Sequence, residues 1–134
     1  MVESSRLASL PIFSELTDEE RTGIASYVDA VEVPAGERIA SEGDFAYEFF
    51  VVESGTAEVQ TKGNRIAELG PGDFFGELGL LVTGRRTADV VASSPMTLIA
   101  MFDRNFRQLE RSQPTFSERI RSVLKERIAR RSSS

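Results

Sequence analysis

The alternation of hydrophobic and polar positions changes character twice and divides the chain into three parts. Apolar residues before Val28 recur at three- and four-residue spacings, as in amphipathic helices. From Val31 to Phe102, short segments rich in Val, Ile, Phe and Thr alternate with glycine-containing turns about every ten residues. After Asp103 the helical spacing returns. The pattern therefore predicts helices, then an antiparallel sheet, then helices.

The first part contains a short apolar lead-in and one well-marked helix start. Leu7 to Phe13 is apolar and is interrupted by Pro11. Thr17 and Glu20 fit a capping box, in which each side chain bonds the backbone N–H of the other residue. We expect the helix to run from Thr17 to about Val28.

The middle part predicts a sandwich or barrel of short strands. The expected strands are 47–52, 56–61, 65–69, 87–92 and 96–102. The first has an unbroken apolar run that predicts burial on both faces, whereas 56–61 and 65–69 alternate as half-buried strands do. Lys62-Gly63-Asn64 between these two is typical of a tight hairpin connection.

The last part predicts two helices. Asp103 is a good N-cap for the first, which carries Phe106 and Leu109 inward. Pro114 ends this helix and begins a second, from about 115 to 130. The second helix has an apolar stripe on a strongly basic background. The stripe consists of Phe116, Ile120, Val123, Leu124 and Ile128.

Length and composition indicate one ordinary globular domain. The chain has 134 residues, of which 40% are hydrophobic and 28% charged. No apolar run approaches the ~20 residues of a transmembrane helix, and the N-terminus does not read as a secretory signal. We therefore expect a cytoplasmic protein without a membrane segment.

Two absent residue types narrow the chemistry. The sequence contains no cysteine and no histidine. Disulfides, thiolate nucleophiles, histidine-ligated metals and histidine general bases are thereby excluded. A cupin-type metal oxygenase, which would share a barrel fold, depends on histidine ligands and is disfavoured for the same reason. The composition favours a binding protein over an enzyme, with no catalytic residue and no metal site.

Charge is distributed unevenly. Residues 1–102 contain 7 basic and 17 acidic residues, a balance of −10, and residues 103–134 contain 9 basic and 4 acidic residues, a balance of +5. A basic end can bind nucleic acid or an acidic surface. It can also be a solvated helix face that complements an acidic body, which is the interpretation we favour.

The segment 70–91, GPGDFFGELGLLVTGRRTADVV, carries the candidate chemistry. Gly76 permits close backbone approach at the start of a short helix, where N–H groups favour an anion. Arg86 can donate two parallel hydrogen bonds to a phosphodiester, and Glu77 can accept a bond from a ribose hydroxyl. Taken alone, Glu77 is better interpreted as a helix-start carboxylate and Arg86 as a solvated loop residue.

These features together resemble the cyclic nucleotide-binding domain. That family includes regulatory subunits of protein kinase A, cyclic-nucleotide-gated channels and the catabolite activator protein. The most specific match is FGELGLLVTGRRTADV at 75–90 to the phosphate-binding cassette, and LPIFSELTDEE, PAGERIASEGD, FFVVESGTAEV and FDRNFRQLERSQP agree in order. The resemblance implies an antiparallel β jelly-roll (double-stranded β-helix) barrel with an N-terminal helix, a short cassette helix and two C-terminal helices. We expect a single domain over 1–134, with a helical entry at 7–29, the barrel at 31–102 and the helices at 103–131.

The resemblance also implies the ligand site. Glu77 would hold the ribose and Arg86 the phosphate, while Thr87 would face the base; backbone contacts are implied at Gly76, Leu78, Gly79 and Thr87. We favour cyclic AMP as the ligand, with cyclic GMP as the alternative, and no cofactor. Arg85 stands where the family often has proline, and it adds a positive charge without an assigned role.

The function implied is a non-enzymatic sensor. Binding would shift the C-terminal helices and signal to an unknown effector protein. In the family the corresponding last helix closes over the base, forms a homodimer or does both, whereas packing of its apolar stripe on the barrel is the role that we favour here. Only Ser132 to Ser134 follow the last helix, with no DNA-binding domain among them, so we expect either that the chain acts on a separate partner or that it is one domain of a larger protein. Two alternatives stay open: a degenerate interaction module that keeps the fold but binds no nucleotide, and a nucleic-acid binder that uses the basic end.

Overall fold

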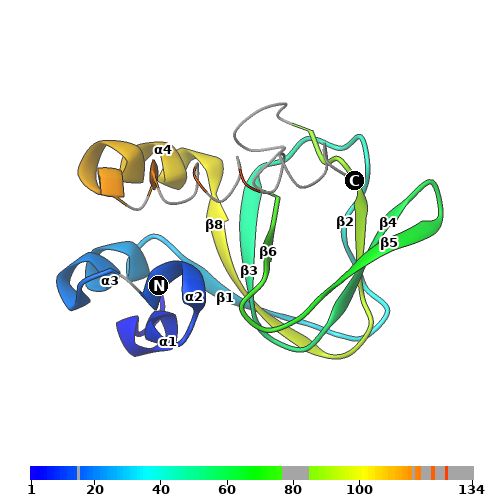
Figure 1. Ribbon diagram of the computed structural model, residues 1–134, viewed down its shortest axis with the longest axis horizontal. Coiled ribbons are helices and arrows are strands. Elements are labelled where there is room, and N and C mark those ends of the chain that lie inside the picture. The colour runs from blue at the N-terminus through cyan, green and yellow to red at the C-terminus, as the bar shows by residue number, and fades with distance from the viewer. Residues whose placement is uncertain (15, 77–84, 116, 119–121, 123–125, 127–134) are drawn as a thin grey trace.

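The computed structural model describes residues 1–14, 16–76, 85–115, 117, 118, 122 and 126. Within them, helices flank two antiparallel sheets (Figure 1). The helices are α1 (Ser4–Ala8), α2 (Pro11–Ser14), α3 (Asp18–Ala25) and α4 (Asp103–Ser112). The strands are β1 (Asp29–Val33), β2 (Arg38–Ala40), β3 (Glu48–Ser54), β4 (Ala57–Thr61), β5 (Asn64–Leu69), β6 (Phe74–Phe75), β7 (Asp89–Ala92) and β8 (Met96–Phe102).

Each sheet has four strands, in the orders β1-β8-β3-β6 and β2-β7-β4-β5. Strands far apart in the chain lie side by side, as in jelly rolls. This arrangement confirms the expected fold class. Hydrogen bonds between the described strands do not close the two sheets into a continuous barrel.

Strand β3 shows why the apolar run at 47–52 is continuous. Phe50 and Val52 belong to the cluster between the two sheets. Phe49 and Val51 point the other way and belong to the cluster shared with the helices. Burial on both faces is thus confirmed, although Tyr47 precedes the strand and its side chain is exposed.

The helices at both ends of the chain share one core on the outer face of the β1-β8-β3-β6 sheet (Figure 1). This cluster contains Leu7, Leu10, Ile12, Phe13, Leu16, Ile24, Ala25, Val28, Phe49, Val51, Phe74, Ile99, Met101, Phe106 and Leu109. Burying one such side chain contributes roughly 1.5–3 kcal/mol. The helical entry and α4 are therefore packed as one unit against the sheet.

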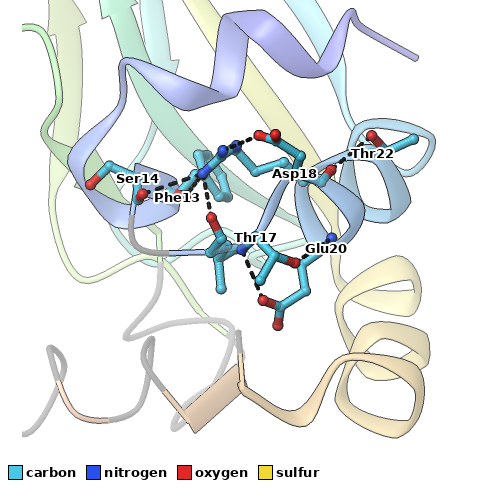
Figure 2. Close-up of polar contacts among 8 residues, drawn as sticks. Phe13, Ser14, Thr17, Asp18, Glu20 and Thr22 are labelled. Carbon is cyan, nitrogen blue, oxygen red and sulfur yellow. Dashed lines mark hydrogen bonds and ion pairs between the residues drawn. The ribbon is translucent and has the colours of Figure 1, made fainter.

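The capping box at the start of α3 is confirmed (Figure 2). The backbone N–H of Glu20 donates to Thr17 Oγ1 at 3.1 Å, and the N–H of Thr17 donates to Glu20 Oε1 at 2.9 Å. The helix ends at Ala25, earlier than the expected Val28. The N–H of Tyr27 donates to the carbonyl of Ile24 in a tight turn that leads into β1.

Arg21 ties this helix to the preceding turn. Its Nη1 donates to the carbonyl oxygens of Phe13, Ser14 and Leu16, and its Nη2 pairs with Asp18 (Figure 2). The Arg21 side chain is only 13% exposed. It therefore supplies hydrogen-bond donors to backbone carbonyls at the end of α2.

We expect Arg21→Ala to lower the free energy of unfolding by about 1.5–3 kcal/mol, because charge-assisted bonds to part-buried carbonyls are lost. Urea denaturation measures the change. Arg107→Ala removes an exposed arginine from α4 and should stay within about 0.5 kcal/mol of the native chain. Equal effects of the two substitutions would contradict the role of Arg21.

Two sequence expectations in this region are wrong in detail. In β5 only Leu69 is buried, whereas 64–68 are exposed; the β4–β5 hairpin projects away from the helices (Figure 1), and its register shifts between Val59 and Gln60. At α4 the N-cap position is Phe102 and not Asp103. Asp103 uses its own N–H for the carbonyl of Tyr47, at 2.8 Å, as β8 passes into the helix.

The hairpin turn between β4 and β5 is as expected, since Lys62 and Gly63 both have positive φ between the paired Thr61 and Asn64.

The expected cassette helix and most of the second C-terminal helix lie outside the described residues. Of the helices within the described ranges, none has the length and apolar character needed to cross a bilayer.

Candidate functional site

The structure brings Gly76 and Arg86 together at the beginning of β3. Gly76 directly follows β6, which pairs with β3 through Phe75 opposite Phe50. Arg86 directly follows Arg85, which forms an isolated bridge with Phe45 before β3 begins. Both predicted site residues are thus positioned against the same strand, one from each end of the cassette segment.

Arg86 is a buried cation. Its residue is 9% exposed, and Nη1 donates to the carbonyl oxygen of Glu48 at 2.8 Å. The guanidinium carbon lies 5.6 Å from the centre of the Phe50 ring, which stacks on Phe75 at 4.9 Å. Within the described residues, Arg86 forms no ion pair with a carboxylate. A guanidinium has five N–H donors, and among the described residues the Arg86 side chain donates to the Glu48 carbonyl alone, so other donors can serve an anion.

Burial lowers the pKa of the Arg86 guanidinium, and the negative charge of Glu48 partly opposes this effect. A lowered pKa means that the folded protein disfavours the cation relative to the unfolded chain. The ordinary arginine pKa lies far above neutrality, so the group remains charged and its burial costs stability at every working pH. An anion bound to Arg86 would offset that cost.

Gly76 makes room for this cation. Its φ is +90°, and a Cβ at this position would lie 2.5 Å from Arg86 Nη1 and 2.8 Å from the carbonyl oxygen of Glu48. Both distances are below those that real Cβ atoms show. Gly76 therefore lies close to the side chain of Arg86, and any larger residue would displace the guanidinium.

The backbone of Arg86 is held by the loop before β3. The N–H of Gly43 donates to the carbonyl of Arg86 at 2.9 Å, and the N–H of Arg86 donates to the carbonyl of Asp44 at 2.7 Å. The carboxylate of Asp89 accepts from the N–H of Glu42 at 2.7 Å and extends the same connection. The orientation of Arg86 is therefore set by residues about forty positions earlier in the chain.

The other predicted site residues divide into two groups. Thr87 is exposed, and within the described part of the chain its hydroxyl makes no hydrogen bond. Glu77, Leu78 and Gly79 lie outside the described residues. The sequence interpretation missed Glu48, because it contributes a backbone carbonyl, which leaves no side-chain signal.

A hollow lies at the end of β3 away from Arg86. It encloses about 560 Å³ and is lined by Glu32, Val33, Pro34, Ser54, Pro95, Met96 and Thr97. The charged residue in this lining is a carboxylate, so the hollow is unsuited to a phosphate ester.

Comparisons with known proteins identify the family of this chain. The cyclic nucleotide-binding domain model matches residues 30–113. A cAMP-dependent protein kinase regulatory subunit from Neurospora crassa is 33% identical over 126 residues, which are 92% of this chain and 33% of that protein. This chain thus spans about a third of the length of that relative.

Two solved structures share the fold. The catabolite activator protein of Thermus thermophilus matches with a TM-score of 0.82 at 31% identity, over 91% of this chain and 60% of that one. A regulatory subunit of a cAMP-independent protein kinase A from Trypanosoma brucei matches with a TM-score of 0.79 at 24% identity, over 91% and 43%. Because the family model covers more than half of the sequence and the fold agrees, this chain belongs to the cyclic nucleotide-binding domain family.

Proposed function

We propose that this chain binds a cyclic nucleotide, cyclic AMP in preference to cyclic GMP, and that Arg86 holds the cyclic phosphate. The observation that carries the proposal is the buried guanidinium of Arg86, which pairs with no carboxylate among the described residues. Buried charges are normally paired. A singly charged phosphodiester fits a planar guanidinium with parallel free donors. The name of the Neurospora relative supports cyclic AMP as the nucleotide.

In this proposal the remaining predicted residues complete the site. Glu77 accepts a hydrogen bond from the ribose 2′-hydroxyl, and the backbone at Gly76, Leu78 and Gly79 approaches the phosphate. The hydroxyl of Thr87 faces the purine. No cofactor takes part.

The proposed role is that of a non-enzymatic regulatory domain over residues 1–134. Nucleotide binding would change the equilibrium between two positions of the C-terminal helices and act on an effector protein. The start of α4 is suited to this coupling, because the N–H of Asp103 bonds the carbonyl of Tyr47 beside the Arg86 loop. At its other end, Gln113 packs closely on Gly23 of α3.

Calorimetric titration with cyclic AMP and cyclic GMP tests the proposal. We expect at least one to bind with a Kd below about 100 µM, which corresponds to about −5.5 kcal/mol. Open-ring 5′-AMP is the matched control and should bind more weakly, because its dianionic phosphate lacks the ring shape. If neither cyclic nucleotide binds below about 100 µM, an interaction module without nucleotide is the better account.

A further inference from the structure

Arg85 and Phe45 are stacked on each other at the surface. The guanidinium carbon of Arg85 lies 4.2 Å from the centre of the Phe45 ring, and Nη1 donates to the carbonyl of Gly43 at 2.8 Å. The two residues also face each other across an isolated antiparallel bridge. A cation over an aromatic face is attracted by the quadrupole of the ring. Arg85 therefore contacts the 43–45 loop through the ring of Phe45 and through the backbone carbonyl of Gly43.

The same loop holds Arg86. Its backbone exchanges hydrogen bonds with Gly43 and Asp44, and its side chain donates to Glu48. These contacts all go to the segment 43–48, so a shift of this segment against Arg85 would move the guanidinium of Arg86. Small displacements of a binding group weaken its interactions strongly.

Packing in a hydrophobic core does not account for the aromatic side chain of Phe45. Its residue is 57% exposed, and it belongs to neither hydrophobic cluster of the described residues. Tyr47 is equally exposed, at 57%, and its ring lies 6.2 Å from that of Phe45. The guanidinium of Arg85 lies over the ring of Phe45. Tyr47, an equally exposed aromatic neighbour, is therefore a suitable control for substitutions of Phe45.

We propose that Phe45, Arg85 and the Gly43 carbonyl form a latch that positions Arg86 for the phosphate. The proposal rests on the proposed binding of a cyclic nucleotide. Arg85 is a positioning residue in this account and acts through Arg86. The latch gives a role to Arg85, the neighbour of Arg86.

Calorimetric titration of variants with the nucleotide that the native chain binds tests the latch. Phe45→Ala should weaken binding about 2- to 5-fold, the value of an exposed cation–π contact. Tyr47→Ala and Phe45→Trp should stay within about 2-fold of the native chain, because both keep a ring under Arg85. Arg85→Ala should weaken binding at least as much as Phe45→Ala, and adding Phe45→Ala to it should cause little further loss.

Amide hydrogen exchange on the ligand-free chain gives a second measurement. The N–H of Arg86 should exchange faster in Phe45→Ala than in the native chain, and at the native rate in Tyr47→Ala.

If the native chain binds neither nucleotide, the proposed function fails and the latch with it. If the native chain binds but Phe45→Ala binds as tightly, only the latch is overturned. A loss in Arg85→Ala without one in Phe45→Ala would likewise overturn the latch, because Arg85 would then act directly on the ligand.

Discussion

Replacing Arg86 by alanine should weaken cyclic nucleotide binding by about 10- to 150-fold. This range corresponds to about 1.5–3 kcal/mol, the usual contribution of hydrogen bonds to a charged group. Arg86 is buried against Phe50 and Glu48, so solvent screens its interaction with an anion less than it would screen that of a surface residue. Calorimetric titration of the native chain and of Arg86→Ala measures the change.

Two further variants separate geometry from charge. Arg86→Lys keeps the charge but loses the planar fork that binds two phosphate oxygens at once, so its affinity should fall between those of the native chain and Arg86→Ala. Arg107→Ala removes an exposed arginine of α4 and should leave affinity unchanged. Equal losses in Arg86→Ala and Arg107→Ala would point to a general effect of net charge and would contradict the assigned role.

Replacing Gly76 by alanine should lower both stability and affinity. The added Cβ meets Arg86 Nη1 at 2.5 Å and the Glu48 carbonyl oxygen at 2.8 Å. Left-handed backbone strain of about 1–2 kcal/mol and overpacking of about 1–3 kcal/mol together lower the free energy of unfolding by roughly 2–5 kcal/mol. Urea denaturation and calorimetric titration check the two effects.

Gly36→Ala is the matched control for that substitution. Gly36 has φ +89°, and a Cβ there meets nothing within 4 Å. Its variant should therefore show only the backbone strain of about 1–2 kcal/mol and an unchanged affinity for nucleotide. A Gly76→Ala variant that behaves like Gly36→Ala would show that the contact between Gly76 and Arg86 does not matter.

Most of the fold could be predicted because local chemistry determines it. The capping box of Thr17 and Glu20 marks the start of α3, and the continuous apolar run in β3 reflects cores on both sides of one sheet. The exposure of β5 could not be predicted in this way. Its alternating pattern is compatible with a half-buried strand, and only the projection of the hairpin leaves 64–68 in solvent.

The residue types of the candidate site could be predicted from the sequence, but the burial of Arg86 and the contacts around it could not. The sequence indicates that Arg86 can bind a phosphate, yet its burial depends on Phe50 and on the carbonyl of Glu48, 38 residues earlier. The stack of Arg85 on Phe45 depends on a contact between two loops. Pairings of this kind arise from tertiary structure, which no local motif encodes.

We infer that Arg86 is a buried cation kept for an anionic ligand, at a cost to the stability of the free protein. Thermal unfolding of the native chain and of Arg86→Met, with and without the nucleotide at about 100 times its native Kd, tests this inference. Binding should stabilise the native chain by about 2.7 kcal/mol and raise its Tm by several degrees. Without nucleotide, Arg86→Met should be at least as stable as the native chain, because it removes a buried charge, and nucleotide should scarcely raise its Tm. An unchanged nucleotide-induced rise in the Tm of Arg86→Met would contradict the account.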